Sequence, residues 1–472
     1  MCSPSSSPRS SRSTMTARPI HKVALFRDLG YVPHPGQIEV HKSTAERRVV
    51  ACGVRWGKTL CAAAEATAAV LAPCNHSIGW VVAPTYDLAD KVYREIVRFA
   101  VEKLRHRVLQ IRESDRRVLM RNLGGGVSEI RAKSADNPTS LLGEGLSWLV
   151  VDEAARLHPR IWQHFLSQRL IDKRGWALLI STPAGRGWFH EMFRRGQSTD
   201  AAWASWNNPT INNPHIDPAR VDAERALLPE RVFRQEYEGA FLEGSGAVFR
   251  NVRECATGTW HEPKPEETYV GGLDLAKVAD YTVLTILDAD ARVVFVDRYN
   301  RLDWSVQVGR VYAACQKYND ARVLVDSTGV GDPVYESLCK ADVRAEGYKF
   351  SNASKSALID NLSLMMEQGR IELPNPELCP ELVEELEQFQ FSVTESGTVR
   401  SGAPGGQHDD MVVSLALAAW MRRHGRPQPG LTLDVESMRR ISAEIRDKQF
   451  RRWTGGPDPL QGRRGTGLMP DF

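Results

Sequence analysis

The sequence has no cysteine pair spaced for metal binding, no long apolar run and no apolar leader. Its eight cysteines include no CxxC pair, and no histidines are spaced to complete a zinc site, which excludes a zinc-ribbon protein. No run approaches the ~20 apolar residues of a membrane-spanning helix. The Ser-, Pro- and Arg-rich stretch 1–18 lacks the apolar core of a secretory signal. We therefore expect a protein that acts inside a cell, with reduced thiols and no membrane association.

Excess charge of one sign is also absent from the chain as a whole, but not from its ends. The 61 basic and 58 acidic residues give a net charge of +3. Residues 1–22 carry four basic residues and no acid, and residues 421–472 carry eleven basic and six acidic residues, so the body between them is acidic. Basic ends suit a polyanionic partner and an acidic body suits carboxylate-rich pockets, although solvated termini have the same composition.

The composition is that of an ordinary globular protein, with 42% hydrophobic and 25% charged residues, and 472 residues suit two large domains or three smaller ones. In the first half, short Val- and Leu-rich runs alternate with helical patterns, which predicts strands of a parallel sheet buried on both faces. The expected strands are 48–52, 78–83, 149–151 and 178–181, and the expected helices between the first three are 59–71 and 89–104.

A stretch rich in Gly and Pro, 242–265, predicts a linker, and the pattern changes after it. Three strand-like runs come first, with a hairpin turn at 288–290, and helices then alternate with one further strand. The expected strands are 269–275, 281–287, 292–298 and 322–326, and the expected helices are 306–318, 333–340, 356–367 and 409–420. This order predicts a mixed-sheet α/β domain.

Residues 52–59 read Cys-Gly-Val-Arg-Trp-Gly-Lys-Thr between an expected strand and an expected helix. The spacing from Cys52 to Gly57 is that of a Walker A loop whose first glycine is displaced to Gly53. Backbone N–H groups of such a loop form a nest for phosphate oxygens at the helix N-terminus. Lys58 would add a cation for the β- and γ-phosphates and Thr59 a ligand for Mg²⁺. The strand before and the helix after disfavour a plain glycine turn.

A second motif ends the buried strand at 149–151 in two carboxylates, Asp152 and Glu153. One acid at a strand end can orient Mg²⁺ and its water, and the next can polarise the attacking water, which is the division of labour that phosphoryl transfer needs. A strand-end cap is the alternative. The Walker A loop about 100 residues upstream favours the catalytic interpretation.

Other polar residues are weaker candidates for the nucleotide site. Gln37, before the first strand, could hydrogen-bond an adenine edge. Ser181 and Thr182 follow the strand at 178–181 and could sense the γ-phosphate, although a plain turn is about as plausible on spacing alone. Arg55, inside the loop, would lie close to the phosphates and could stabilise charge in the transition state.

The second half places acids where strands and helices should meet: Asp274, Asp280, Asp326, Asp409 and Asp410. Burying several carboxylates together is costly unless cations neutralise them, so a convergent cluster implies Mg²⁺ or Mn²⁺ with oxygen ligands. Two such ions about 4 Å apart can activate a water and stabilise the leaving oxygen of a phosphodiester. Each acid alone is explained as well by capping, and their joint order carries the nuclease interpretation.

Taken together, the motifs resemble those of the large terminase subunit of tailed bacteriophages, prophages and related gene transfer agents. The resemblance covers about residues 30–425. It rests on the order of five motifs: Gly53-Val-Arg-Trp-Gly-Lys-Thr59, Val150-Val-Asp-Glu-Ala154, Ile180-Ser-Thr-Pro183, Gly272-Leu-Asp-Leu with Asp-Tyr-Thr282, and His408-Asp-Asp-Met-Val412.

The resemblance implies an N-terminal RecA-like P-loop ATPase domain, the packaging motor, at 23–245 and a ribonuclease H-like mixed-sheet nuclease domain at 246–425, flanked by a disordered basic segment 1–22 and a basic tail 426–472. It implies ATP-driven translocation of double-stranded DNA into a viral prohead and cleavage of concatemeric DNA. The implied cofactors are ATP and Mg²⁺ in the first domain and two Mg²⁺ or Mn²⁺ in the second. The implied partners are DNA, a portal protein, a small terminase subunit and further copies in a ring, in the cytoplasm of a bacterial host and transiently at the prohead portal.

By the same resemblance, each candidate residue takes a role. In the ATPase these are Gln37 for adenine, Gly53, Arg55, Gly57, Lys58 and Thr59 in the Walker A loop, Asp152 as the Walker B acid, Glu153 as the catalytic glutamate, and Ser181 and Thr182 as the coupling motif. In the nuclease, Asp274, Asp326 and Asp410 would be metal ligands, with Asp280 and Asp409 auxiliary, and the choice between Asp409 and Asp410 stays open.

Two departures and two alternatives remain. Cys52 opens the loop where relatives have a small residue or glycine. Leu142 stands where some relatives carry a basic residue proposed to reach the neighbouring subunit's nucleotide, and Arg131, Arg156 and Arg160 are unranked substitutes.

A helicase-nuclease of DNA repair is one alternative function, and a translocase whose second domain is an inactive DNA clamp is the other. The tails bind a partner or are only solvated ends.

Overall fold

The computed structural model describes residues 20–242, 246–275, 281–328, 331–393, 399–403 and 408–424. The basic ends 1–19 and 425–472, including the amphipathic stretch 433–450, lie outside the described residues, as does Asp280. None of the helices in the described ranges combines the length and the apolar character that a bilayer crossing needs.

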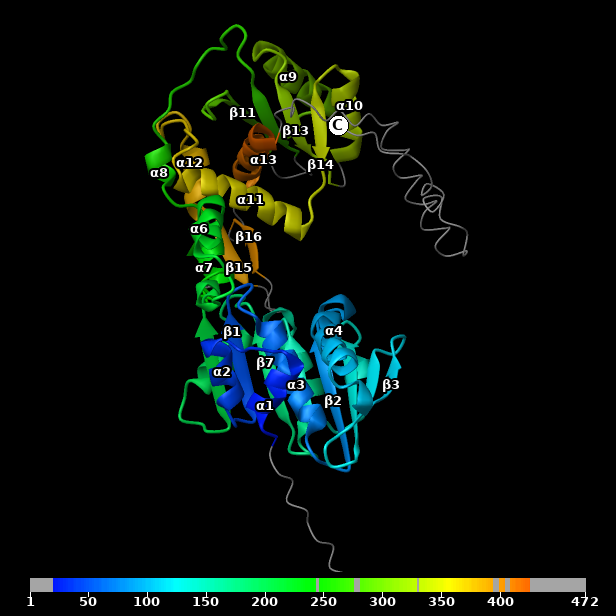
Figure 1. Cartoon of the computed structure of the whole chain (residues 1–472). Coiled ribbons are helices and arrows are strands. Elements are labelled where there is room, and N and C mark those ends of the chain that lie inside the picture. The colour runs from blue at the N-terminus through cyan, green and yellow to red at the C-terminus, as the bar shows by residue number, and fades with distance from the viewer. Residues whose placement is uncertain are drawn as a thin grey trace, which may run out of the picture. The chain divides into compact units, whose positions relative to one another are not determined.

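The first half is built on an eight-stranded sheet with the order β3-β4-β5-β2-β6-β7-β1-β8 (Figure 1). The strands are β1 (Arg47–Cys52), β2 (His76–Ala83), β3 (Val108–Arg112), β4 (Arg117–Arg121), β5 (Val127–Ser134), β6 (Trp148–Asp152), β7 (Trp176–Ser181) and β8 (Trp203–Asn208). Neighbours from β5 to β8 are parallel, whereas β4 is antiparallel to both β3 and β5. The parallel core confirms the predicted α/β class.

The sequence predicted β1, β2, β6 and β7 because their interiors are apolar and buried. It missed β3 and β4, whose apolar runs are only two or three residues long and whose residues are largely exposed or half-buried. It also missed β5 and β8. The antiparallel β3–β4 extension is therefore a finding of the structure.

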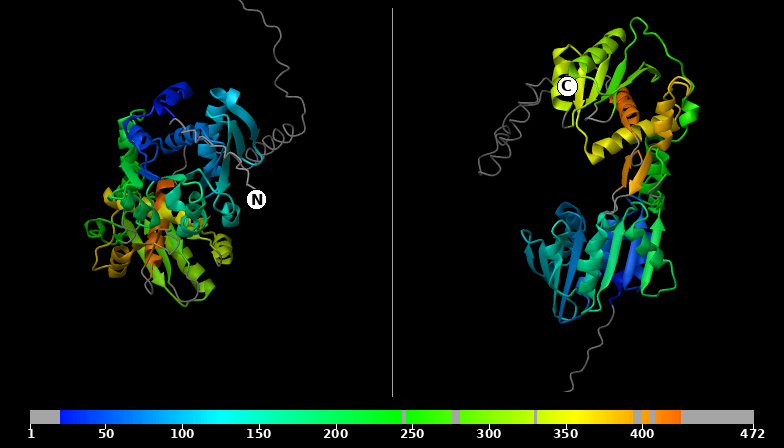
Figure 2. Two further views of the ribbon diagram at one scale, coloured as in Figure 1. Left: turned by 90° about the horizontal axis from the view of Figure 1, so that it is seen from below. Right: turned by 180° about the vertical axis from the view of Figure 1, so that it is seen from behind.

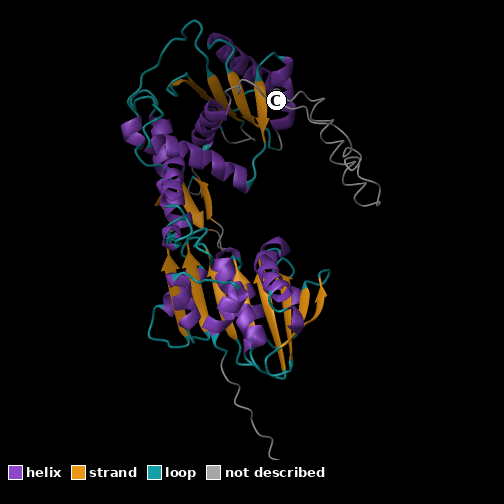
Figure 3. Ribbon diagram, viewed as in Figure 1, coloured by secondary structure: helices purple, strands orange, loops and turns teal. Residues whose placement is uncertain are grey.

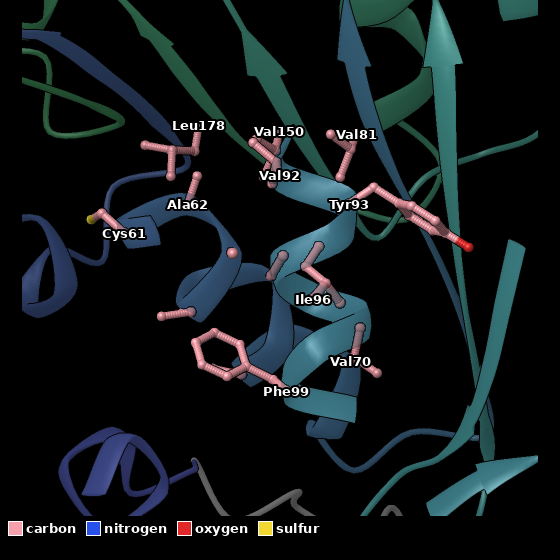
Figure 4. Close-up of a cluster of buried hydrophobic side chains, with 14 of the residues drawn as sticks. Cys61, Ala62, Val70, Val81, Val92, Tyr93, Ile96, Phe99, Val150 and Leu178 are labelled. Atoms are coloured by element: carbon pink, nitrogen blue, oxygen red, sulfur yellow. The ribbon is translucent and has the colours of Figure 1, made fainter. Parts of the chain in front are cut away.

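Helices cover both faces of this sheet. On one face lie α1 (Lys22–Leu29), α2 (Pro35–Lys42), α3 (Lys58–Leu71) and α4 (Tyr86–Glu102). Figure 4 shows the core between α3, α4 and the strands, where Ala62, Ile96 and Val150 face one another. The other face packs against α5 (Trp188–Gly196) and the short turns η2 (Pro138–Leu141), η3 (Ala154–Arg156), η4 (Ile161–Leu166) and η5 (Ser167–Leu170). Figure 2 includes the view from behind.

Further short elements complete the first half of the chain and lead into the second. They are η1 (Arg105–Arg107), η6 (Thr210–Asn212), α6 (Pro218–Leu227), α7 (Glu230–Glu236) and α8 (Val252–Cys255).

The second half is built on a five-stranded mixed sheet with the order β12-β11-β10-β13-β14. The strands are β10 (Val270–Asp274), β11 (Thr282–Leu287), β12 (Val293–Tyr299), β13 (Arg322–Asp326) and β14 (Ala345–Tyr348). β10, β11 and β12 form an antiparallel meander, and β13 and β14 add in parallel. The hairpin turn is held by Asp288, whose Oδ1 accepts hydrogen bonds from the N–H groups of Asp290 and Arg292, each at 2.9 Å. This confirms the predicted mixed sheet and its hairpin.

Two helical layers enclose this sheet, as Figure 3 shows in purple around the orange strands. One core contains α9 (Trp304–Lys317) and α10 (Gly331–Lys340), and the other contains α11 (Asn352–Glu367), α12 (Pro380–Gln388) and α13 (Asp410–His424). A small third sheet, β16-β15-β9, consists of β9 (Gly246–Ala247), β15 (Gln390–Val393) and β16 (Val399–Gly402). The sequence did not predict α12, β14 or this small sheet.

Candidate functional sites

Strand register brings the motifs of the first half to one edge of the sheet. β7 lies between β1 and β6, with Ala51 opposite Ser181 and Ile180 opposite Asp152. Because the three strands are parallel, their carboxyl ends meet, and in open α/β sheets this edge is where ligands bind. The Walker A loop, the acid pair and the hydroxyl pair are therefore neighbours.

Each carbonyl of the Walker A loop has a hydrogen-bond donor within the protein. Gly57, the N-cap of α3, has φ = 100° and Arg55 has φ = 59°, two left-handed residues in a tight turn. Lys58 Nζ donates to the carbonyls of Cys52 (2.7 Å) and Gly53 (2.8 Å). Thr210 Oγ1 donates to the Val54 carbonyl (2.6 Å), and Asn213 Nδ2 donates to the Arg55 carbonyl (2.7 Å). From α2, His34 Nε2 donates to the Trp56 carbonyl (2.9 Å), and Gln37 Nε2 donates to the Gly57 carbonyl (3.0 Å). Every carbonyl from 52 to 57 therefore has a donor, but the N–H groups of Gly53, Val54 and Trp56 are also used, by the carbonyls of Asn208 (2.9 Å), Glu236 (2.7 Å) and Gly53 (3.4 Å). The N–H groups of Arg55, Gly57 and Lys58 are the ones left to form an anion nest.

Lys58 links this loop to the hydroxyl pair. Its Nζ lies 3.2 Å from Thr182 Oγ1, and the side chain is buried. Burial lowers the pKa of Lys58. Thr59 follows it in the first turn of α3 and is half-buried, whereas the Arg55 side chain is exposed. The structure thus places the loop residues together at the start of α3.

The acid pair has contrasting surroundings. Asp152 is buried at the end of β6, and burial together with the Glu153 carboxylate raises the pKa of Asp152 to about 7. Glu153 has φ = 50°, and its Oε2 lies 3.4 Å from Arg156 Nε and 3.5 Å from Ser181 Oγ. A strained backbone at a strand end suits a positioned functional group. A nearby cation would keep Asp152 ionised at neutral pH.

Gln37 does not present a free amide. Its side chain is buried, its Oε1 accepts from the His34 N–H at 3.1 Å, and its Nε2 donates to the Gly57 carbonyl at 3.0 Å. Both ends of the amide are therefore used by the protein itself. The structure places Gln37 against the Walker A loop, and an adenine contact would have to share these groups.

Residues that no sequence motif marked support the loop from its other side. Asn207, near the end of β8, donates through Nδ2 to the Ala51 carbonyl at 2.6 Å and to the Gly239 carbonyl at 2.5 Å. Thr210 and Asn213 bind the loop directly, as described above. The available signal was the Asn-rich run 207–213, which carries four asparagines in seven residues.

Two of the candidate arginines are already engaged within the chain. Arg131 pairs with Glu129 and, at 3.1 Å, with Glu144. Arg156 contacts Glu153 of its own acid pair. Arg160 is exposed and lines a cavity of about 720 Å³ beside the sheet edge. The structure does not place any of the three at a second nucleotide site.

In the second half, strand register and a close helix bring the acids together. Leu273 lies opposite Val325 in the parallel β10–β13 pair, so Asp274 and Asp326 end adjacent strands. α13 packs directly on β10, where a Cβ on Gly272 would lie 2.1 Å from the Ser414 carbonyl oxygen. Only glycine permits this approach, which sets Asp410, one turn before Ser414, beside Asp274.

Electrostatics show that these carboxylates form one group. Burial and the charges of Asp410, Asp326 and Asp409, in that order, raise the pKa of Asp274 well above its usual value. Each of the other acids also has a local partner: Asp326 Oδ1 accepts from Thr328 N at 2.8 Å, Asp410 Oδ2 from Tyr281 N at 3.2 Å, and Asp409 Oδ2 from Lys355 Nζ at 3.1 Å. In the described ranges, no three His, Cys, Asp or Glu side chains already converge as ligands of one ion.

Two residues beside the acid group were missed. Glu385 on α12 is buried, accepts the Met411 N–H at 2.9 Å and pairs with Arg298 at 3.4 Å. Burial raises the pKa of Glu385 to about 7. Lys355 on α11 supplies the cation at Asp409. Nothing in the sequence marked either residue, because neither stands in a motif.

Comparisons with known proteins match both halves. The family model "Terminase large subunit, T4likevirus-type, N-terminal" matches residues 50–254, and "Terminase RNaseH-like domain" matches residues 271–422. The chain is 33% identical over 438 residues to "Terminase, large subunit" of Thermus virus P23-45, covering 83% of this chain and 88% of that protein. It is 25% identical over 387 residues to "Terminase, large subunit" of Escherichia phage T5, covering 78% and 85%.

A solved structure shows the same fold. A large terminase from a thermophilic bacteriophage superposes with a TM-score of 0.56 over 83% of this chain and 99% of that chain, at 14% identity. The matches disfavour a helicase-nuclease of DNA repair. Since the Thermus virus relative is matched over most of its length, this chain belongs to the large terminase subunit family of tailed bacteriophages, with a packaging ATPase in its first half and a nuclease in its second.

Proposed function

We propose that the sheet edge formed by β1, β6 and β7 hydrolyses ATP to move double-stranded DNA into a viral prohead, and that the acid group of the second half cuts concatemeric DNA. The observation that carries this proposal is that every loop carbonyl has a donor within the protein, while the N–H groups of Arg55, Gly57 and Lys58 stay available at the start of α3 beside two carboxylates. These three N–H groups are proposed to form the nest, and Gly53, whose N–H donates to the Asn208 carbonyl at 2.9 Å, opens the loop.

In the ATPase site each residue has a task. Lys58 neutralises the β- and γ-phosphates, and Thr59 with Asp152 holds the Mg²⁺ that ATP brings. Glu153 polarises the attacking water. Ser181 and Thr182, which contact Glu153 and Lys58, report the state of the γ-phosphate to the rest of the domain.

In the nuclease site, Asp274, Asp326 and Asp410 are proposed to hold divalent metal ions, with Asp409 and Asp280 auxiliary. The donor set is all carboxylate oxygen, which suits Mg²⁺ or Mn²⁺, and the raised pKa of Asp274, caused by burial and the neighbouring carboxylates, supports a cation at this group. A bound ion supplies an activated water and stabilises charge on the leaving oxygen. Two ions are proposed, as the number of acids allows. The carboxylates that would hold these ions come from β10, β13 and α13.

Domain limits, partners and location extend the proposal. The ATPase would occupy 23–245 and the nuclease 246–425, and the charged ends 1–22 and 426–472 would engage a portal protein or a small terminase subunit. Several copies would form a ring at the portal, in the cytoplasm of a bacterial host. Family membership supports a packaging role in general.

The test uses one variant for each site. Glu153→Gln is expected to abolish DNA-stimulated ATP turnover while ADP still binds, because the amide keeps the shape of the side chain but cannot polarise water. Asp326→Ala is expected to stop plasmid cleavage in Mn²⁺ and spare ATP turnover. An Asp326→Ala protein that cuts as fast as the parent would refute the nuclease assignment and favour an inactive DNA clamp.

Packaging itself is tested by supplying purified proheads, linear DNA and ATP to the full chain with its small subunit. The parent should protect DNA from external nuclease, and Glu153→Gln should protect none. Protection that persists in the Glu153→Gln protein would refute the motor assignment.

A further inference from the structure

The short helix α2 lies against the Walker A loop and bonds it at two points. His34, its N-cap, donates from Nε2 to the Trp56 carbonyl at 2.9 Å, and Gln37 donates from Nε2 to the Gly57 carbonyl at 3.0 Å. The rings of His34 and Trp56 meet edge to face at 4.7 Å. A Cβ on Gly36 would lie 2.8 Å from the Trp56 ring, so the contact is tight.

These two bonds, together with the bond from the Cys61 N–H to the Gly57 carbonyl (3.0 Å), determine where the Gly57 and Lys58 amides point. A peptide unit is planar and trans, so its C=O and N–H point in opposite directions. The Trp56 carbonyl shares its unit with the Gly57 N–H, and the Gly57 carbonyl shares its unit with the Lys58 N–H. By holding both carbonyls, α2 directs both N–H groups away from itself, toward the side on which phosphate binds.

The far end of α2 is fixed to the Walker A helix by a buried cluster of charges. Glu65 on α3 accepts from His41 Nδ1 at 2.7 Å, from Arg48 at 2.6 Å and from Lys22 at 2.8 Å. His41 closes α2, Arg48 lies on β1 and Lys22 begins α1. Glu65, His41 and Arg48 are buried, whereas Lys22 is a third exposed. Tyr31 adds a bond from its hydroxyl to His41 Nε2 at 3.0 Å.

Glu65 therefore connects four elements around the nucleotide site without touching the loop. His41 is one turn after Gln37 on the same eight-residue helix. Any shift of α2 along α3 moves Gln37 and His34 away from the loop carbonyls. The carboxylate keeps its charge because the pKa of Glu65 is lowered to about 2 by its hydrogen bond from His41 and the charges of Arg48 and Lys22, against the effect of burial.

We propose that α2 is a clamp for the Walker A loop, that Gln37 and His34 set the loop's peptide planes for phosphate binding, and that Glu65 is the positioning residue that anchors the clamp. The inference rests on the proposed ATPase site and goes beyond it, because Gln37 then serves phosphate recognition rather than adenine recognition. Disturbing Glu65 should weaken the binding of any ligand that occupies the nest, whatever base it carries.

The experiment compares Glu65→Gln with Glu129→Gln in the full chain. Glu129 is the matched control, since it is also buried, on β5, and paired with two arginines, Arg117 and Arg131. Glu65→Gln should raise the KM for ATP and the Kd for ADP on the order of tenfold, the scale of coupling within one network, with kcat within about threefold. The inhibition constant of inorganic pyrophosphate should rise by the same factor. Glu129→Gln should leave the ADP Kd within about twofold of the parent's.

A gentler variant keeps the test decisive if Glu65→Gln fails to fold. Lys22→Met removes the partly exposed partner only, and should raise the ADP Kd about threefold with the melting temperature nearly unchanged. An unchanged ADP Kd in the folded variants overturns the clamp, as does an equal rise in Glu129→Gln. A weakening seen for ADP but not for pyrophosphate would return Gln37 to adenine recognition. Failure of the parent to hydrolyse ATP would instead count against the proposed ATPase, and ADP binding would still decide on the clamp.

Discussion

Replacing Gly272 by alanine should disable the nuclease while leaving the ATPase intact. Gly272 lies in the middle of β10, where α13 passes directly over it. A Cβ at this position would lie 2.1 Å from the Ser414 carbonyl oxygen, 2.4 Å from the Ala418 amide nitrogen and 2.7 Å from Leu417 Cβ. Two of these atoms belong to the backbone of α13, so no side-chain rotation relieves the overlap.

The size of the effect follows from the distances. Ordinary contact begins at 3.4 Å, so α13 has to retreat by roughly 1 Å, because close-packed interiors absorb overlap only by moving whole elements. Overpacking of this kind costs about 1–3 kcal/mol or more. The retreat also breaks the bonds from Ser414 Oγ to the Gly272 carbonyl (2.8 Å) and to Thr285 Oγ1 (2.9 Å). Since α13 carries Asp410, a displacement of ~1 Å should slow cleavage about 100-fold.

The assay is plasmid cleavage in Mn²⁺, with ATP turnover and calorimetric melting measured on the same preparation of the full chain. Gly309→Ala is the matched control, because Gly309 lies on α9 and its added Cβ would meet nothing within 4 Å. That control should cleave the plasmid at the parent's rate, and its free energy of unfolding should rise by about 0.4–1 kcal/mol. Normal cleavage by Gly272→Ala would show that α13 does not position the acid group, and the reasoning would fail.

Three further predictions concern the first half. Gly57→Ala should abolish nucleotide binding, because φ = 100° disfavours any side chain and the new Cβ would lie 2.6 Å from Gln37 Nε2. Titration of the folded variant with ADP checks this prediction. The folded pKa of Asp152 is raised to about 7, so its contribution to stability is present below about pH 4 and is lost as pH rises through 7. Without Mg²⁺, the melting temperature should therefore fall between about pH 4 and pH 7. Asp152→Asn should flatten this dependence of the melting temperature on pH. The folded pKa of Glu65 is lowered to about 2, so its contribution of about 3 kcal/mol to the free energy of unfolding is present above pH ~4.5 and is lost as pH falls to 2. Glu65→Gln should therefore remove that part of the acid denaturation curve. A steep acid limb that persists in Glu65→Gln would contradict the last prediction.

Local signals in the sequence were sufficient for the central elements of both sheets. Apolar runs predicted β1, β2, β6 and β7, since a strand covered on both faces must be apolar throughout its interior. Glycine and acid positions predicted which strand ends carry chemistry. By contrast, β3 and β4 near the sheet edge have apolar runs of only two or three residues, and β14 is half exposed, so these strands leave little pattern to recognise.

The sequence alone predicted which residues carry the chemistry: the loop up to Lys58, the Asp152–Glu153 pair and the aspartates of the second half, because phosphate nests and carboxylate groups need fixed residue types at fixed local spacing. Only the tertiary structure decided what holds them in place. Gln37 and Asn213 bond one loop from a helix and a turn far apart in the chain, Glu65 gathers partners from three other elements, and Glu385 accepts a bond from the start of α13. These supporting contacts depend on packing between distant segments, and no local pattern records which buried carboxylate or amide will meet which backbone group.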